Sequence, residues 1–198
     1  MTRWRDLPER PYDVILADPP WSYYGQQGKW GAAAKFYATA PDEMISTLPV
    51  PELLTDRGVL FLWATSPRLD IAMACLAGWK LHFRGVAFVW VKARKDGVPI
   101  GAQGVRPSIV KPTVEYVLAA SRVAKGRPMQ LGDEGVANVV LAPKRAHSQK
   151  PEEIRASIDR LYPNASKLEL FARSRRHGWD AWGDEVGKLS GPEAPAVR

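Results

Sequence analysis

The sequence contains little of the chemistry on which several common protein classes depend. Among its 198 residues Cys75 is the single cysteine, so no internal disulfide can form, and none of the usual zinc spacings is present. The three histidines are scattered without an HxxxH pairing, so we expect no metal site. Cys75 itself is better interpreted as a small buried apolar residue than as a nucleophile.

Long apolar runs and nucleotide-binding glycine motifs are also missing. The longest apolar stretches, such as GVLFLWA (58–64), are far too short to span a bilayer, and the charged N-terminus offers no signal-peptide core. No GxGxxG follows a strand-like run and no P-loop motif occurs, which disfavours a nicotinamide dehydrogenase and a P-loop nucleotidase. We expect a cytoplasmic protein that does not bind a membrane.

Positive charge is in excess. There are 28 Lys and Arg residues against 21 Asp and Glu, a net charge of +7. Such an excess concerns partners rather than fold, and nucleic acid is the commonest polyanion, although a basic protein with no such partner is the alternative. We expect phosphates to be held around the mouth of a site by basic residues of the aperiodic segments: Lys92, Arg94, Lys95, Arg106, Lys111, Arg122, Lys125 and Arg127.

Apolar runs and helical patterns alternate along the chain. Runs rich in β-branched and aromatic residues predict strands, several of them apolar on both faces, at 12–18, 58–64, 84–92, 113–121, 137–143 and 167–173. Helical spacing occurs at 41–48, 67–78 and 151–162. Two Gly-rich stretches, 22–35 and 93–112, predict long loops. The alternation predicts an α/β fold, a mostly parallel sheet with helices on both faces, as a single domain over 1–186 with a disordered tail over 187–198.

The first predicted strand ends in Asp18, which is followed by Pro19, Pro20 and Trp21. Asp18 and Pro19 each precede a proline and are therefore pushed toward extended geometry, and neither proline can donate to a neighbouring strand. Ligands of open α/β sheets sit outside the carboxyl ends of the strands. The segment therefore predicts two rigid acceptors, the Asp18 carboxylate and the Pro19 carbonyl, beside an indole face.

Two acceptors beside a flat aromatic surface suit a planar ligand with an amino group, such as a nucleobase. The lone pair of such an amine is delocalised, and accepting both of its N–H bonds would aim that lone pair at an electrophile. Stacking of the base on Trp21 would contribute about 1–3 kcal/mol. Because the prolines fix the acceptors in advance, no ordering cost falls on the reaction. The alternative is a Pro-Pro turn that ends a strand, with Asp18 as a surface charge.

This motif is one of several blocks in which the sequence resembles the mRNA adenosine methyltransferase catalytic-subunit (MTA-seventy) family. The resemblance covers about Tyr12 to Val186 and includes, in order, ADPPW, KFYATAPDEM, GVLFLWAT, FVWVK, KPTVEYVL, HSQKPEEI, KLELFAR and GWDAWGDEV. It implies a Rossmann-like class I methyltransferase fold, circularly permuted so that the catalytic strand comes first. It also implies S-adenosyl-L-methionine as the cofactor and, from the aspartate of the motif, the 6-amino group of adenine as the target.

The resemblance also implies roles for individual residues. The catalytic motif would be Asp18, Pro19, Pro20 and Trp21. The cofactor would be held by Asp18, Lys150, Glu169, Phe171, Arg173, Asp184 and Glu185. The target base would be held by Trp21, Tyr37, Lys111, Glu115 and Arg145. The target-site residues have plain alternatives: packing for Tyr37, a solvent-facing strand position for Glu115, and solvated charges for Lys111 and Arg145.

Physical arguments bear on some of these assignments. Lys150 directly precedes Pro151, where a helix is predicted to begin. The helix macrodipole disfavours a cation there by about 0.3–1 kcal/mol, and a bound anion such as the cofactor carboxylate would reverse the sign. The alternative is an exposed lysine. Glu169 alternates with its leucine neighbours, and we expect Phe171 to share its face of the strand. Asp184 stands where the family commonly has asparagine. Aspartate can still accept hydrogen bonds there, but it adds a negative charge.

The sequence therefore predicts methylation of adenine in nucleic acid, on a base that is flipped out or single-stranded. Without a separate target-recognition domain, we expect low intrinsic sequence specificity or dependence on a partner in a homo- or heterodimer. Small bacterial and phage members of the family more often modify DNA, so DNA is preferred over RNA. The alternatives are a catalytically silent nucleic-acid-binding subunit and methylation of a protein amide, for which asparagine would better suit the motif.

Overall fold

The structure of the chain, a computed structural model, describes residues 4, 6–21, 42–102, 109–145 and 149–186. Its strands are β1 (Tyr12–Ala17), β2 (Leu54–Thr65), β3 (His82–Ala93), β4 (Val114–Ser121), β5 (Val139–Pro143), β6 (Lys167–Leu170) and β7 (Asp180–Trp182). Its helices are α1 (Asp42–Ser46), α2 (Val50–Leu53), the 3-10 turn η1 (Ser66–Arg68), α3 (Leu69–Gly78) and α4 (Glu152–Leu161). Tyr37, Arg106, the predicted loop 22–35 and the predicted tail 187–198 lie outside the described residues.

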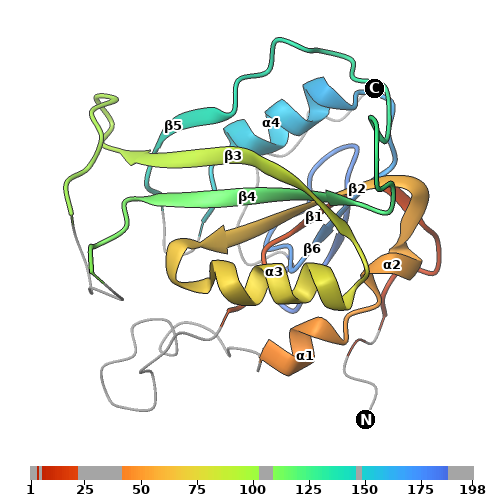
Figure 1. The fold of residues 1–198 in the computed structure, drawn as a ribbon. Helices are drawn as coiled ribbons and strands as arrows, with labels where there is room; N and C mark the ends of the chain where they lie inside the picture. The colour runs from red at the N-terminus through yellow and green to blue at the C-terminus, as the bar shows by residue number, and fades with distance from the viewer. Residues whose placement is uncertain (1–3, 5, 22–41, 103–108, 146–148, 187–198) are drawn as a thin grey trace.

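The described strands form one sheet in the order β5-β3-β4-β2-β1-β6-β7 (Figure 1). β1 is parallel to β2 and β6, β6 is parallel to β7, and β3 is parallel to β5. β4 runs antiparallel to both of its neighbours, β2 and β3. The predicted α/β fold with a mostly parallel sheet is confirmed, as are the six predicted strands and three predicted helices.

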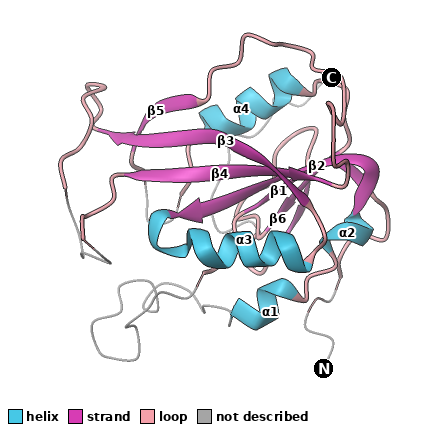
Figure 2. Cartoon of the chain, viewed as in Figure 1, coloured by secondary structure: helices cyan, strands magenta, loops and turns pink. Residues whose placement is uncertain are grey.

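Helices cover both faces of the sheet, as predicted (Figure 2). α1, α2 and α3 lie on one face, where Leu76 of α3 shares a core with Ile15 of β1. α4 lies on the other face, where Ile158 shares a second core with Val14, the neighbour of Ile15. Successive strand residues thus serve different cores, which explains why the runs are apolar on both faces. Cys75 lies in α3 with 2% exposure, so it is the small buried residue that the sequence predicts.

α4 shows why its sequence forms a helix at this place. Ile154 and Ile158 lie one turn apart and are buried, while charged residues fill most of the remaining positions. Glu152 and Glu153 stand in the first turn and Arg160 in the last, the distribution that the helix macrodipole favours. Pro151 precedes the helix in extended geometry, so Lys150 lies two positions before its first residue.

Candidate active site

Asp18 lies directly beyond the carboxyl end of β1, between β2 and β6. Its backbone N–H donates to the carbonyl of Leu170 at 3.4 Å, and the chain then turns sharply, since the N–H of Trp21 donates to the Pro19 carbonyl at 2.8 Å. A carbonyl oxygen has two lone pairs, so the Pro19 oxygen can accept one further hydrogen bond. Asp18 and the Pro19 carbonyl thus lie together at the edge of the sheet, and their role as the acceptor pair stays a prediction.

Trp21 anchors this turn. Its indole N–H donates to the Trp63 carbonyl at 2.9 Å, and its side chain belongs to the core on the α3 face. With 4% exposure, the indole is not the open stacking surface that the sequence predicts. The contact with Trp63 instead ties the Asp18 segment to β2, because a buried indole needs a hydrogen-bond partner.

Lys150 joins carboxylates from two different strands. Its Nζ lies 3.0 Å from Oδ2 of Asp18 and 3.3 Å from Oε2 of Glu115, and 5.2 Å from the ring centre of Trp63. The side chains of Lys150 and Glu115 are 18% and 13% exposed. Both alternatives, an exposed lysine and a solvent-facing glutamate, are therefore wrong. The structure brings together residues to which the sequence gives separate roles in catalysis, cofactor binding and target-base binding.

Lys92 makes a contact within the site that sequence reasoning missed. Its Nζ lies 2.7 Å from Oε1 of Glu115 and 5.3 Å from the ring centre of Trp90. The sequence places Lys92 among the expected phosphate-binding residues, but in the structure it completes a chain of alternating charges: Asp18, Lys150, Glu115, Lys92. The antiparallel register that pairs Trp90 with Glu115 creates this contact. The sequence contains no direct signal of that register.

Burial and neighbouring charges shift the pKa values of these four alternating charged residues differently. Burial raises the pKa of Asp18, and Lys150 opposes that rise in part. Burial also disfavours the charged form of Glu115, yet Lys150 and Lys92 together bring its pKa below the usual value. For Lys150 the cost of burial is outweighed by Asp18 and Glu115, which raise its pKa. At neutral pH Glu115 and Lys150 stay charged, and Asp18 is the carboxylate of this chain that a proton reaches most easily.

Most of the predicted cofactor residues lie around the carboxyl ends of β6 and β7, and three of them are ion-paired. Glu169 accepts from Arg155 of α4 at 2.7 Å, with side chains 9% and 12% exposed. Arg173 Nε lies 2.8 Å from Glu185 Oε2, while the neighbouring Asp184 is exposed. Burial raises the pKa of Glu169, Arg155 opposes the rise, and the charge of Asp18 adds to it.

The expectation that Phe171 shares the face of Glu169 is wrong. β6 ends at Leu170, and Phe171 has φ of +61°, in the left-handed region, so strand alternation stops there. Phe171 packs against the core on the α3 face, the core that contains Leu170, whereas Glu169 turns toward Arg155 of α4.

Two further predicted residues, Lys111 and Arg145, differ in their burial. Lys111 is half-buried in the segment before β4. Arg145 is 41% exposed, and its Nη2 lies 3.9 Å from Glu153 in the first turn of α4. The basic segment after β6 is partly structural, because Arg176 pairs with both Glu152 and Asp159 of α4. The target-base roles of Lys111 and Arg145 stay predictions.

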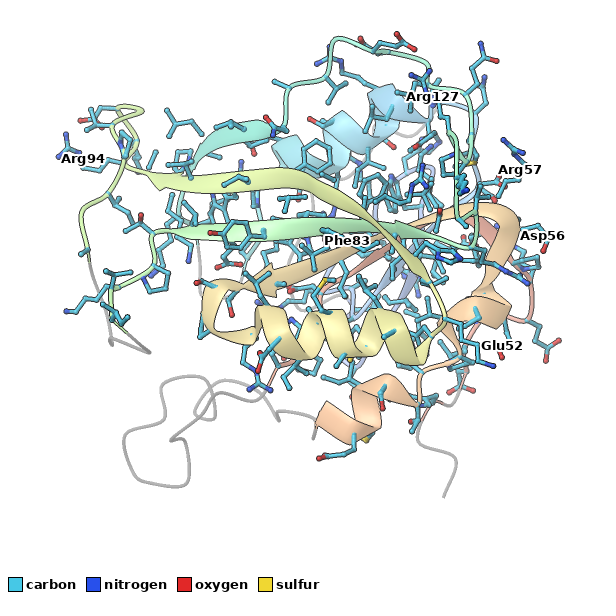
Figure 3. All side chains as sticks on the ribbon, viewed as in Figure 1. Glu52, Asp56, Arg57, Phe83, Arg94 and Arg127 are labelled. Atoms are coloured by element: carbon cyan, nitrogen blue, oxygen red, sulfur yellow. The ribbon has the colours of Figure 1, made fainter. Side chains whose placement is uncertain are left out.

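The expectation that all the basic residues surround one site is wrong. Since β4 is antiparallel, its beginning lies beside the end of β2, with Glu115 opposite Thr65, and its end lies beside Val59. These two positions on β2 are about 20 Å apart. Figure 3 shows Arg94 at one end of the sheet and Arg127 at the other. The basic residues thus divide between the Asp18 edge (Lys92, Arg94, Lys95, Lys111) and the far edge (Arg122, Lys125, Arg127).

Within the described ranges, no group of three or more histidine, cysteine, aspartate or glutamate side chains could hold a metal ion. The helices of those ranges are all too short or too polar to cross a membrane.

The chain is an α/β protein with a mostly parallel sheet, and half-buried charges lie at the edge of the sheet where β1 ends, the edge at which ligands of such sheets commonly bind. The chain belongs to the MT-A70 family, whose model matches residues 12–185, and the resemblance seen in the sequence is thereby confirmed. MT-A70 methyltransferases use S-adenosylmethionine as the methyl donor.

Similar proteins come from bacteria, plants and animals. The Type II methyltransferase M.MunI of a Mycoplasma species is 30% identical over 91% of this chain and 80% of its own length. The N(6)-adenosine-methyltransferase MT-A70-like protein of Arabidopsis thaliana is 32% identical over 88% of this chain and 24% of its own length. The human N(6)-adenosine-methyltransferase catalytic subunit METTL3 is 30% identical over 88% of this chain and 28% of its own length. The chain therefore spans most of M.MunI but only about a quarter of the plant and human proteins.

Proposed function

We propose that this protein transfers the methyl group of S-adenosylmethionine to the 6-amino group of adenine in a nucleic acid. The observation that carries this proposal is the contact of Lys150 with Asp18 and Glu115, at 3.0 and 3.3 Å, beyond the carboxyl end of β1. Family membership and the names of the plant and human relatives support the same reaction.

The chain's own groups suit the chemistry of a weakly nucleophilic amine. The Asp18 carboxylate and the free lone pair of the Pro19 carbonyl accept the two N–H bonds, which localises the nitrogen lone pair. Burial raises the pKa of Asp18, and the positive charge of Lys150 opposes that rise and so favours the ionised carboxylate. A new N–C bond forms as the S–C bond breaks, and the amine then loses a proton, which Asp18 is placed to accept.

The residues present fit the cofactor. Lys150 stands just before the N-terminal end of α4, and its ammonium retains one N–H donor beyond its contacts with Asp18 and Glu115, enough for a carboxylate, a group that helix N-termini attract. Arg173, Asp184 and Glu185 follow the carboxyl ends of β6 and β7, where ligands of such sheets lie. When bound, S-adenosylmethionine supplies a methyl carbon on a positively charged sulfur.

We further propose that the fold is a circularly permuted class I methyltransferase fold. In support, β1 and β6 are adjacent and parallel in the sheet, although β1 is the first strand along the chain and β6 comes near the end of the chain. The catalytic motif follows β1, and the predicted cofactor residues lie in and after β6 and after β7. In this arrangement the amine acceptors and the cofactor residues lie at the ends of two neighbouring strands.

DNA is the favoured nucleic acid, in a bacterial or phage cytoplasm. The support is that the chain covers 80% of a bacterial type II methyltransferase but 28% of METTL3. The exposed or half-buried residues Arg94, Lys95 and Lys111 at the Asp18 edge would hold phosphates rather than read bases, so we expect low sequence preference. A second copy or a partner subunit would then supply target selection.

The test offers the purified protein methyl-labelled S-adenosylmethionine with single- and double-stranded DNA and RNA of mixed sequence. Nucleosides from each digest are identified by mass spectrometry. We expect N6-methyladenine, with more label in DNA than in RNA. Labelled cytosine or labelled protein would contradict the proposal. Binding of nucleic acid without binding of cofactor would instead identify the silent-subunit alternative.

A further inference from the structure

Two lysine side chains at the Asp18 edge lie over a pair of touching indole rings. Lys92 Nζ lies 5.3 Å from the ring centre of Trp90, and Lys150 Nζ lies 5.2 Å from that of Trp63. The two rings meet edge to face, with centroids 6.2 Å apart and an interplanar angle of 83°, and both are buried. Because a cation is attracted to the face of an indole, the aromatic pair supports both ammonium groups from the core side.

The Glu115 carboxylate joins these two ammonium groups through different oxygens. Oε1 lies 2.7 Å from Lys92 Nζ, and Oε2 lies 3.3 Å from Lys150 Nζ. Glu115 stands opposite Trp90 in the antiparallel pair of β3 and β4, so Lys92 is its diagonal neighbour on the same face of the sheet. The carboxylate is therefore fixed from two sides, and each of its oxygens contacts one lysine.

Lys92 is placed for an internal contact rather than for a phosphate. Its backbone N–H donates to the Thr113 carbonyl at 3.1 Å, and its carbonyl accepts from the N–H of Ile100 at 2.9 Å. The side chain of Lys92 is 20% exposed, whereas that of Arg94, two positions further on, is 60% exposed. A phosphate that bound Lys92 would take it from Glu115, whose side chain is mostly buried, and a buried carboxylate that loses its cation is costly.

The contact of Lys92 with Glu115 bears on Asp18 through Lys150. The terminal torsion of a glutamate is soft, so without Lys92 the Glu115 carboxylate could turn both of its oxygens toward Lys150. Glu115 would then compete with Asp18 for the Lys150 ammonium, which lies 3.0 Å from Asp18 Oδ2 when Lys92 is in place. Lys92 removes this competition because it occupies one oxygen of Glu115.

We propose that Lys92 is a positioning residue for methyl transfer: it fixes Glu115, and so keeps the Lys150 ammonium on the Asp18 carboxylate. This inference rests on the proposed function. Lys92 itself contacts neither the target base nor the cofactor, and it acts on the reaction only through the residues between it and Asp18.

The charged groups around Asp18 set the direction of the expected effect. Burial raises the pKa of Asp18, Lys150 and Arg173 lower it, and Glu115 raises it. Asp18 is also coupled to Glu169, since burial raises the pKa of Glu169 and the charge of Asp18 adds to that rise. Of these groups, Lys150 lowers the pKa of Asp18 most, so a change that draws Lys150 away from Asp18 raises this pKa.

The test measures the single-turnover rate of methyl transfer against pH, at saturating cofactor, on the nucleic acid that the wild type methylates best. The acid limb of this profile is the range in which the rate falls as Asp18 gains a proton. Lys92→Met should move the acid limb to higher pH by at least about half a pH unit. It should also slow transfer about tenfold at the plateau, because small displacements at a reacting site are costly.

Two further variants serve as controls. Lys92→Arg keeps the positive charge and should keep the acid limb of the wild type. Lys80→Met removes an exposed lysine beyond the other end of β3 and should change neither the acid limb nor the plateau. An acid limb of Lys92→Met that stays in place or moves to lower pH would overturn the inference.

The salt dependence of nucleic-acid binding separates this role from a phosphate contact. In Lys92→Met the slope of log K against log salt should equal that of the wild type. A slope that decreases by about 1, with an acid limb that stays in place, would identify Lys92 as a phosphate contact and overturn the inference.

A double variant covers the case in which Lys92→Met does not fold. Lys92→Met combined with Glu115→Gln removes both charges of the pair, which a protein tolerates better than the loss of one. Because Lys92 acts through Glu115, the double variant should have the acid limb of Glu115→Gln alone. A different acid limb would overturn this inference while the wild type still methylates adenine. A wild type that transfers no methyl group would overturn the proposed function as well.

Discussion

The ammonium of Lys150 lies 3.0 Å from the carboxylate of Asp18, although most of the fold separates the two residues in the chain. Lys150 comes from the segment before α4 and Asp18 from the end of β1. Their contact brings the catalytic motif and the predicted cofactor lysine into one electrostatic unit, which Glu115 extends toward Lys92. The charge of this unit controls the protonation of Asp18.

The acid limb of the pH–rate profile should report that control. Methyl transfer falls as pH drops through the pKa of Asp18, because a protonated carboxyl loses an acceptor. Lys150 lowers this pKa and Glu115 raises it. Lys150→Met should therefore move the acid limb to higher pH and Glu115→Gln to lower pH, measured as kcat at saturating cofactor. Shifts of both variants in the same direction would contradict this account.

The buried pair of Arg155 and Glu169 should dominate stability at the carboxyl end of β6. Arg155→Met leaves the Glu169 carboxylate buried without its cation, which should cost about 3–5 kcal/mol at pH 7. Burial already raises the pKa of Glu169 and Arg155 opposes that rise, so the variant's pKa rises further. A raised carboxyl pKa means that the folded state binds the proton more tightly than the unfolded state.

The free energy of unfolding that Arg155→Met loses relative to the wild type should therefore shrink as pH falls from 7 toward about 4.3, the pKa of glutamate in an unfolded chain. Urea unfolding at several pH values measures it. Arg94→Met breaks an exposed pair with Asp96 and should cost less than about 1 kcal/mol. A deficit in Arg155→Met that grows on acidification would contradict the assigned role of Glu169.

Gly183 should tolerate no side chain. A Cβ there would lie 2.7 and 2.8 Å from the backbone oxygen and nitrogen of Ala172, so Gly183→Ala should destabilise the protein by about 1–3 kcal/mol. Gly78→Ala is the matched control, because Gly78 ends α3 and a Cβ added to it would meet no atom within 4 Å, so the change should be neutral or slightly stabilising. Thermal unfolding of both variants decides, and equal melting temperatures would show that the close approach is absent.

The two groups of basic residues should differ in their effect on nucleic-acid binding. Arg94→Ala with Lys95→Ala removes charge at the Asp18 edge, so affinity should fall and the slope of log K against log salt should decrease by about 1–2. Lys125→Ala with Arg127→Ala removes the same charge at the far edge, about 20 Å along the sheet, and should leave both quantities unchanged. Fluorescence anisotropy at several salt concentrations measures both. An equal loss for the two pairs would show that nucleic acid contacts the far edge.

Much of the fold was predictable because its strands are buried on both faces. Runs such as that at the centre of β2 are apolar throughout, and the helical spacing of Ile154 and Ile158 in α4 is unambiguous. α2 and β7 were missed because four and three residues are too few to show a period. The antiparallel direction of β4 was missed because no residue pattern within a buried strand encodes the direction of its neighbour.

The site was predictable only where a local motif defines it. Asp18, the two prolines and Lys150 stand at positions whose backbone consequences can be worked out from the sequence. The role of Lys92 depends on the register that sets Trp90 opposite Glu115, and the burial of Trp21 depends on the Trp63 carbonyl. Both are tertiary relationships, fixed by packing between strands rather than by neighbours in the chain.

The most direct test of the central claim compares Asp18→Ala with Asp56→Ala, whose side chain is 93% exposed. Single-turnover transfer of labelled methyl to an adenine-containing DNA is measured alongside cofactor binding. The account predicts at least about a 100-fold slower transfer for Asp18→Ala at a cofactor concentration that saturates the variant, and a wild-type rate for Asp56→Ala. Transfer by Asp18→Ala at the wild-type rate would contradict the account.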